Sequence, residues 1–227
     1  MRIPRIHTTF LLLAVALATT TALAQTSISA SVYGAFSGTT TGNGTTQSPA
    51  NQAGGLVEVR HISNPILGFE ATYSLNRADQ TFSKLIYPPT SSSCPAPCGP
   101  YTENLRVPAN AHEVTADWVP SVHIANLRPF AVLGVGLLLN VPSGNQTLTT
   151  TNSAGSSTSG PSTGASTSTT PVYVYGAGVD WGLIPHIGLR LQYRGNLYKA
   201  PDLSKLYTST DTFTHTAEPM VGIYVRF

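Results

Sequence analysis

Charged residues and long apolar runs are both scarce in this sequence. Lys, Arg, Asp and Glu make up only 10% of the 227 residues, although 41% are hydrophobic. Beyond the N-terminal segment the longest apolar run is PFAVLGVGLLLNV, residues 129–141. It is too short for a spanning helix, which needs roughly 20 residues, but suits a tilted membrane strand of roughly 9 to 11. The sequence therefore excludes a membrane-spanning helix after the N-terminus.

Cysteine is also rare, and the two present, Cys94 and Cys98, stand close together in SSSCPAPCGP. In an exported protein such a pair is typical of a structural disulfide that closes a surface loop. A metal site would need more ligands, and no neighbouring His or Cys offers them. We therefore expect a disulfide, no metal and no cofactor.

The N-terminal residues have the layout of a secretory signal peptide. Arg2 and Arg5 precede an apolar run at residues 10–18, and the sequence ALA ends at Ala24, just before Gln25. That apolar run is also too short for a membrane anchor. We expect residues 1–24 to be cleaved and residues 25–227 to form one domain.

The chain has no excess of positive charge. It contains 12 Lys+Arg and 10 Asp+Glu, a formal net charge of +2, and cleavage of a leader that contains Arg2 and Arg5 brings this to zero. A neutral chain gives no electrostatic case for nucleic acid as a partner.

Apolar and polar residues alternate with period two in eight segments, which predicts eight β-strands. The fourth segment changes parity, because Leu105 and Val107 are apolar at odd positions whereas Val114 and Trp118 are apolar at even positions. We infer a bulge near Ala111, or a strand that starts later. The expected strands are 28–38, 57–62, 67–76, a segment ending at 118, 131–140, 173–181, 187–197 and 213–227.

The connections between these segments alternate between long and short. The long ones are a Thr/Gly/Asn-rich loop to about residue 53, a proline-containing loop at 77–101, a Ser/Thr/Gly/Asn segment at 142–171, and a loop around Pro201. Prolines disfavour pairing inside a sheet, and the 142–171 segment is too poor in apolar residues to fold alone, so we expect it to be flexible and exposed. Long loops that alternate with short turns are typical of outer-membrane barrels.

Alternation alone does not say which face lies outside, since a lipocalin-like soluble barrel alternates with its apolar face inward. The bases on the polar faces are all Arg, the cation suited to crowded pairing with carboxylates, and most of their neighbours are small. This favours a polar lumen. We predict a lumen-facing ion network of Glu58, Arg60, Glu70, Glu113, Asp117, Asp180, Arg190, Arg194, Glu218 and Arg226.

Three aromatic residues fall on the apolar face where a strand meets a short turn or the chain end. They are Trp118, Trp181 and Phe227. We predict that they form an aromatic girdle at one membrane interface, the alternative being ordinary packing at strand ends.

The segments YGAGVDWGLIPHIGLRLQYRGNLYKAPDL and HTAEPMVGIYVRF resemble small bacterial outer-membrane β-barrel proteins of the OmpA-like and OmpX-like type. The resemblance implies an all-β fold, an eight-stranded antiparallel up-and-down transmembrane β-barrel with long extracellular loops and short periplasmic turns. It also implies that Ile223, Tyr224, Val225 and Phe227 form the signal read by the barrel-assembly machinery. We expect a monomer in the bacterial outer membrane, with outer-membrane lipid and this machinery as partners.

Candidate catalytic residues do not combine into a site. His215 and Glu218 are three apart and would point to opposite faces of a strand, and His61 has only Ser63, beside a turn, in phase with it. His112, His123 and His186 lie near strand ends or turns. We therefore expect no enzyme but a structural or surface-interaction role through the extracellular loops. The alternatives are a small diffusion channel and a lipid A-modifying enzyme.

Overall fold

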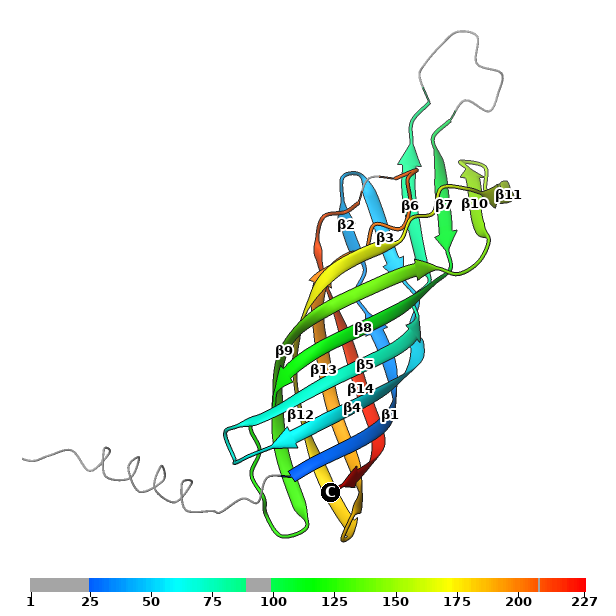
Figure 1. The fold of residues 1–227 in the computed structure, drawn as a ribbon. Helices are drawn as coiled ribbons and strands as arrows, with labels where there is room; N and C mark the ends of the chain where they lie inside the picture. The colour runs from blue at the N-terminus through cyan, green and yellow to red at the C-terminus, as the bar shows by residue number, and fades with distance from the viewer. Residues whose placement is uncertain (1–24, 89–98, 208) are drawn as a thin grey trace, which may run out of the picture.

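Eight strands close into one antiparallel barrel in the computed structural model, which describes residues 25–88, 99–207 and 209–227. The order around the barrel is β1-β14-β13-β12-β9-β8-β5-β4, and the first strand pairs with both β14 and β4 (Figure 1). The barrel strands are β1 (Gln25–Ser37), β4 (Gln52–Ile62), β5 (Gly68–Arg77), β8 (Ala109–Trp118), β9 (Leu127–Pro142), β12 (Ser168–Ile184), β13 (Ile187–Lys199) and β14 (Phe213–Arg226). Closure leaves no open edge in the barrel wall, as predicted. Within these described ranges, no helix is long and apolar enough to cross a membrane.

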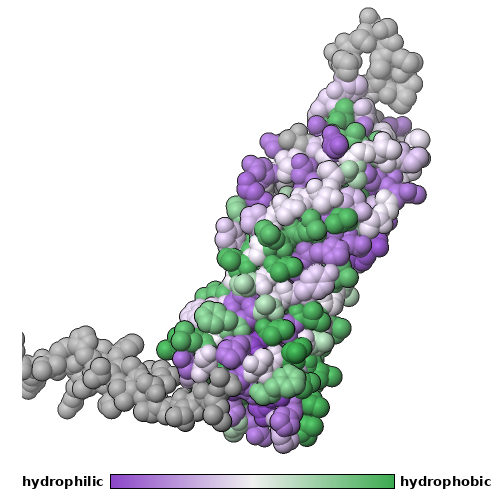
Figure 2. Space-filling model, viewed as in Figure 1, coloured by the Kyte–Doolittle hydropathy of each residue, from purple (hydrophilic) through white to green (hydrophobic). Residues whose placement is uncertain are grey.

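The apolar face of the barrel points outward. Val32 is 64% exposed and Ile223 is 56% exposed, whereas Arg190 and Arg194 are fully buried inside. Figure 2 shows hydrophobic side chains gathered over the barrel strands, while the far end of the molecule is mostly hydrophilic. This is the arrangement of a transmembrane barrel and not of a soluble one, so the predicted orientation is confirmed.

Six further strands form a second sheet beyond the long-loop end of the barrel (Figure 1). Their order is β11-β10-β7-β6-β3-β2. They are β2 (Thr40–Gly42), β3 (Thr45–Pro49), β6 (Gln80–Ile86), β7 (Tyr101–Val107), β10 (Gln146–Asn152) and β11 (Ser157–Ser162). We call this the upper sheet. Because long loops of such barrels are extracellular, it projects outside the cell.

The expected bulge near Ala111 is wrong, whereas the alternative, a strand that starts later, is confirmed. β7 ends at Val107, β8 begins at Ala109 after Pro108, and β8 pairs with β5 and β9 in continuous register. Leu105, Val107, Ala109 and Glu113 are all buried, so the odd positions keep facing inward. The parity change in the sequence reflects a change of environment, because the interior is apolar in the upper sheet and polar in the membrane.

The expectation of a flexible loop at residues 142–171 is also wrong. Residues 146–162 form the β10–β11 hairpin, whose cross-strand pairs include Thr149 Oγ1 with Ser159 Oγ at 2.8 Å. β10 also pairs with β7, and Leu148 packs against the apolar core of the upper sheet. β-branched Thr favours strands, so a segment poor in apolar residues is ordered by the sheet beside it.

Two of the three other long loops also contain strands of the upper sheet. Residues 80–86 and 101–107 pair as β6 and β7, because the prolines lie outside these strands. In the first loop, Asn43 and Gly44 have φ of 52° and 72° and connect β2 to β3, the two-residue hairpin that Asn-Gly favours.

Two predictions lie outside the described residues. They are the signal peptide, residues 1–24, and the disulfide between Cys94 and Cys98.

The β13–β14 connection, described for residues 200–207 and 209–212, packs across the inner side of the upper sheet. Leu203 and Tyr207 are buried in one cluster with Phe82, Leu105, Val107 and Ala109. The same connection reaches β2, where Thr210 Oγ1 lies 3.0 Å from Thr40 Oγ1, and residue 164, where the Lys205 amide donates to the Gly164 carbonyl at 2.9 Å. It therefore covers the outer mouth of the barrel.

Candidate functional site

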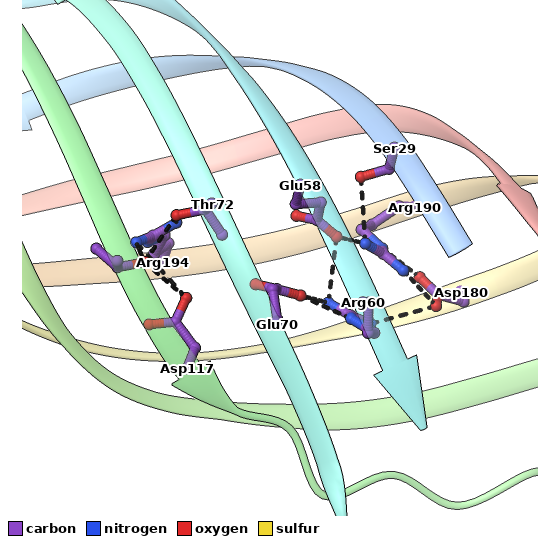
Figure 3. A network of polar contacts seen from close by, with 10 residues as sticks. Ser29, Glu58, Arg60, Glu70, Thr72, Asp117, Asp180, Arg190 and Arg194 are labelled. Atoms are coloured by element: carbon purple, nitrogen blue, oxygen red, sulfur yellow. Dashed lines mark hydrogen bonds and ion pairs between the residues drawn. The ribbon is translucent and has the colours of Figure 1, made fainter. Parts of the chain in front are cut away.

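The barrel interior gathers nine of the ten charged residues predicted for the ion network. Glu58, Arg60, Glu70, Glu113, Asp117, Asp180, Arg190, Arg194 and Glu218 are all 5% exposed or less. They come from six of the eight barrel strands and divide into two groups, part of which Figure 3 shows. The tenth, Arg226, lies half-buried at the short-turn end, where its Nε donates to the Pro185 carbonyl at 2.7 Å.

The first group, the lower cluster, consists of Glu58, Arg60, Glu70, Asp180 and Arg190. Arg60 donates to Glu70 at 2.6 Å and to Asp180 at 3.3 Å, joining strands on opposite sides of the lumen. Arg190 donates two hydrogen bonds to Asp180, at 2.6 and 2.7 Å, and also forms an ion pair with Glu58 (Figure 3). Bidentate Arg–carboxylate pairs of this kind are the strong ones.

Two aromatic rings complete the lower cluster. The Arg60 guanidinium lies 4.0 Å from the centroid of Phe130, and Arg190 lies 5.4 Å from the same ring and 5.5 Å from Tyr224. Both rings are buried and face the lumen. Stacking on aromatic faces stabilises these cations in addition to their carboxylate partners. Together they fill the cross-section of the barrel.

The second group, the upper cluster, is organised by Arg194. Its Nη2 donates to Glu113 at 3.0 Å and to Thr115 at 2.8 Å, and its Nη1 donates to Thr72 at 3.0 Å. Asp117 is 3.8 Å from the same guanidinium. Asn196 donates to the second oxygen of Glu113 at 2.9 Å. One cation thus holds together side chains from three strands.

Acids outnumber bases inside the barrel. Six buried carboxylates face three buried guanidinium groups, and Arg226, the fourth predicted base, stands at the rim. In the part of the chain that the structure describes, Glu218 forms no ion pair and its Oε2 has no hydrogen-bond partner. The surplus of acids in the predicted network, six acids to four bases, is therefore present in the folded barrel.

The three predicted girdle residues lie at the short-turn end of the barrel and face outward. Trp118, Trp181 and Phe227 are 38%, 50% and 73% exposed. The Trp118 indole donates to the Ile66 carbonyl in the neighbouring turn at 2.6 Å. This leaves the ring on the apolar surface with its polar atom bonded, as an interfacial tryptophan requires. Of the predicted assembly residues, Ile223, Val225 and Phe227 face outward, whereas Tyr224 faces the lumen.

A second belt, at the long-loop end, was missed by the sequence reasoning. The Tyr73 hydroxyl lies 2.9 Å from Nδ1 of His112, and the Tyr175 hydroxyl lies 2.8 Å from Nε2 of His215, both pairs on the outer face. A signal was present, since Tyr and His occupy outward positions in these strands. Tyrosine and histidine have an apolar body and a polar tip, which suits the edge of an apolar band.

Three further histidines, His61, His123 and His186, lie at the short-turn end. His61 hydrogen-bonds Thr26 at 3.0 Å, and His186 lies 3.2 Å from the Arg226 carbonyl. In the turn after β8, burial and the nearby Arg128 and Arg226 lower the pKa of His123, so its neutral form is favoured.

The side chain of Glu218 points into the barrel and that of His215 points outward, so the barrel wall separates them as predicted. The described residues contain no group of three or more His, Cys, Asp or Glu side chains able to hold a metal ion.

The fold and its polar interior are consistent with one family of proteins. The model of the family described as "Outer membrane protein beta-barrel domain" matches residues 10–222. The chain belongs to this family. It is a transmembrane β-barrel protein of the bacterial outer membrane. The short turns, the start of β1 and the end of β14 therefore face the periplasm. No curated protein matches the chain in sequence.

Several solved outer-membrane proteins are similar in structure. Ail of Yersinia pestis, solved with the heparin analogue sucrose octasulfate, is 16% identical, with a TM-score of 0.43, covering 90% of this chain and 99% of Ail. Neisserial surface protein A is 13% identical, with a TM-score of 0.45 and coverage of 89% and 97%. OprG of Pseudomonas aeruginosa is 10% identical, with a TM-score of 0.44 and coverage of 89% and 95%.

Proposed function

We propose that this chain is a non-enzymatic outer-membrane protein whose plugged barrel carries an extracellular surface that contacts other molecules. The observation that carries the proposal is the filled lumen beneath an ordered upper sheet. A pore would need a continuous water path, whereas ion pairs and rings cross the lumen in the lower cluster. The side chains that cross the lumen fill the space that a channel would leave open, and they join strands on opposite sides of it.

The spaces left inside support the same conclusion. A cavity near Glu113, Asn196 and Glu218 has a volume of about 30 Å³, and one at the periplasmic mouth near Asp180 and Tyr224 has about 10 Å³. A single water needs roughly 10–15 Å³ of such volume, so the first space holds about two or three waters and the second about one. Neither is large enough to pass a hydrated solute.

The upper sheet supports an interaction role. It has its own apolar core, and its β10–β11 hairpin exposes Ser and Thr side chains to solvent. An ordered surface loses less conformational entropy on binding than a flexible loop, because its side chains are already positioned. Polar, rigid and extracellular residues are suited to contact with envelope components or other surfaces.

Planar-bilayer recording tests the plugged lumen. Purified protein should give no reproducible conductance steps at either polarity. An Arg60→Ala/Arg190→Ala variant that remains folded removes the cross-lumen pairs and provides the positive control. Reproducible steps from the unmodified protein would assign it instead as a small diffusion channel.

Mass spectrometry of lipid A tests the absence of enzymatic activity. Cells that overexpress the protein should contain lipid A with an unchanged mass spectrum. A new lipid A species that depends on the folded barrel would establish a lipid-modifying enzyme. The separation of His215 from Glu218 by the barrel wall supports the unchanged spectrum.

Assembly is the second part of the proposal. We infer that Ile223, Val225 and Phe227 are read by the barrel-assembly machinery as the last strand arrives. Ile223 and Val225 share the outward face of β14, Phe227 follows that strand directly and is also exposed, and β14 closes the barrel against β1. Tyr224 contributes from the inner face, where it packs over Arg190.

A further inference from the structure

Two arginines, Arg128 and Arg226, lie at the periplasmic mouth of the barrel. Arg128 stands near the start of β9, two positions before the buried Phe130, and Arg226 ends β14, two positions after the buried Tyr224. Side chains two apart on a strand share a face, and both arginines line the small cavity at the mouth. Their guanidinium groups therefore point toward the barrel axis and not toward the surrounding lipid.

Neither of these arginines forms an ion pair within the described ranges of the chain. The acid opposite Arg128 in the register of β9 and β12 is Asp180. Asp180 instead accepts hydrogen bonds from Arg60 and Arg190 of the lower cluster. The mouth therefore carries two cations whose nearest acid is held by other partners.

The hydrogen bonds of the two side chains leave donors for a ligand. Arg128 donates to Gln25 on β1, across the mouth, and Nε of Arg226 donates to the Pro185 carbonyl at 2.7 Å. A guanidinium group has five N–H donors, so each side chain retains several. Burial, together with the charge of both arginines, lowers the pKa of His123, so their positive potential extends to the turn after β8.

A recess opens beside Arg226 between the turns that follow β8 and β12, which both project at this end of the barrel (Figure 1). The turns are joined where the Gly182 amide donates to the Asn126 carbonyl at 2.8 Å. The recess has a volume of about 350 Å³ and adjoins the small cavity at the mouth through Arg226, which lines both. We call it the periplasmic recess. Its lining is polar on one side and apolar on the other, and includes His123, Asn126, Arg226, Leu183, Ile184 and Pro185.

We propose that the periplasmic recess binds the C-terminal carboxylate of a peptide. Arg128 and Arg226 hold the carboxylate, and the last side chains of the peptide pack against Leu183 and its apolar neighbours. Guanidinium groups pair with carboxylates through parallel charge-assisted hydrogen bonds. An inorganic anion would contact the arginines but leave the apolar side of the recess uncovered, whereas a peptide end contacts both sides.

This inference goes beyond the proposed extracellular role, because the recess lies at the opposite end of the barrel from the upper sheet. Failure of the surface-interaction proposal would leave the periplasmic recess unaffected. Failure of the peptide site would leave the plugged barrel and its upper sheet unchanged.

An NMR titration of residues 25–227 in a non-ionic detergent tests the proposal, because such a detergent brings no anionic headgroup. The probe is acetyl-Leu-Ala-Ala with a free C-terminal carboxylate, compared with the same peptide as its C-terminal amide. The free carboxylate should shift the amide signals of residues 122–126 and 182–186 to saturation. The amidated peptide should bind about tenfold more weakly, because its charge-assisted hydrogen bonds are lost.

Arg128→Gln/Arg226→Gln should weaken binding of the carboxylate peptide about tenfold and leave that of the amidated peptide unchanged. Arg77→Gln/Arg106→Gln is the matched control, because it removes the same charge at the extracellular end. Arg77 and Arg106 are 53% and 64% exposed and both pair with Asp79. The control should keep peptide affinity within about twofold of wild type, since distant charges are screened.

Two further variants keep the test decisive. Arg226→Gln alone leaves the bond between Arg128 and Gln25 intact and should still weaken binding of the carboxylate peptide. Leu183→Ser, in the apolar side of the recess, should weaken both forms of the peptide by a similar factor. Heat modifiability on gels verifies that each variant is folded.

Any of four results would overturn the proposal. Equal affinity for the carboxylate and amidated peptides would show that the charge is not recognised. Acetate or inorganic phosphate that binds as tightly as the peptide would assign a simple anion site. Equal weakening by the extracellular control would indicate a charge effect without a site. Displacement of the peptide by anionic phospholipid, with shifts at the same residues, would assign a lipid headgroup as the ligand.

Discussion

At the scale of single residues, the interior depends on three arginines that are each surrounded by acids. Arg60, Arg190 and Arg194 are buried, and each has carboxylates within ion-pair distance. Removing one partner of a buried pair leaves an uncompensated charge, which costs more than the pair itself contributes. Because six buried acids share three buried arginines, loss of one arginine leaves several acids without a cation. We therefore expect the free energy of unfolding to fall more on loss of an arginine than on loss of an acid.

Arg194→Gln tests the larger of these effects. The change leaves Glu113 and Asp117 without their cation, and we expect it to lower the free energy of unfolding by about 3–5 kcal/mol. Urea unfolding in lipid vesicles, followed by tryptophan fluorescence, measures it. Arg77→Gln, a surface arginine, should change the same quantity by about 1 kcal/mol or less. Similar losses in the two variants would contradict this account of the upper cluster.

Glu218→Gln should have the opposite outcome. Glu218 forms no ion pair among the described residues, so the amide keeps the size of this side chain and breaks no contact to a cation. We expect the free energy of unfolding to stay the same or rise, measured by the same urea titration. A loss comparable to that of Arg194→Gln would mean that Glu218 is a required member of the network.

Tyr207 predicts a pH effect confined to the extracellular end. Burial and a 2.9 Å hydrogen bond to Glu103 raise the pKa of Tyr207. A raised pKa means that Tyr207 contributes fully below its unfolded-state pKa of about 10, and that this contribution declines as the pH rises above it. Amide exchange in residues 200–212, corrected for its intrinsic rate, should increase above about pH 10.

Tyr207→Phe lacks the ionisable hydroxyl and should remove that pH dependence while weakening the loop by about 1 kcal/mol at neutral pH. Tyr87→Phe is the matched control, because Tyr87 is 74% exposed and should leave the profile unchanged. A profile that is identical in Tyr207→Phe and wild type would rule out Tyr207 as its origin.

At the scale of strands, the barrel could be predicted from the sequence and the upper sheet could not. Barrel strands alternate strongly because one face meets lipid and the other a polar lumen, as in residues 187–197. β10 and β11 meet water on most sides, so Thr149 and Ser159 leave no such pattern. The local signals of the upper sheet were the Asn43-Gly44 turn and the alternation that includes Leu105 and Val107.

The candidate site was predictable only in part for a related reason. Parity indicates that Arg60 and Asp180 face the lumen, but they are 120 residues apart and their pairing depends on which strands lie opposite each other. Barrel order and tilt determine this, and neither is encoded in alternation. The contacts of Asp79 with Arg77 and Arg106 were not predicted, because Asp79 follows the predicted strand and Arg106 lies on β7, a strand of the upper sheet that the sequence did not predict.

Leu148→Ser tests whether the upper sheet is stable independently of the barrel. Leu148 packs on the core formed by Leu105 and its neighbours, so a hydroxyl there should loosen the β10–β11 hairpin. Limited proteolysis should cut residues 146–162 at least about threefold faster, while the heat-modified gel shift stays unchanged. Thr151→Ser, at an exposed pair with Ser157, is the control. Loss of the gel shift would show that the two parts unfold together.

At the scale of the whole molecule, closure depends on the last strand. β14 pairs with β1 on one side and β13 on the other, and Phe227 continues the pairing through its amide, which donates to the Thr26 carbonyl at 2.9 Å. A barrel resists SDS because every backbone group in its wall is paired. Unheated protein should therefore migrate differently from heated protein on a gel.

Deletion of Phe227 should reduce the fraction of protein that reaches this heat-modifiable form in cells. Phe227→Tyr keeps an aromatic end and should assemble like wild type. Outer-membrane fractionation with unheated gels measures both variants. Equal assembly of the deletion variant would exclude a role for the terminal aromatic residue in recognition by the assembly machinery.

The turn between β10 and β11 has a practical consequence. Residues 153–158 are all exposed, and the hairpin that carries them is anchored by β7 on one side only. Additional sequence there would extend away from the cell without crossing the wall or the core below it. A foreign epitope inserted after Ala154 should be displayed on living bacteria and stained by antibody, which makes this hairpin a carrier for peptide libraries or vaccine antigens.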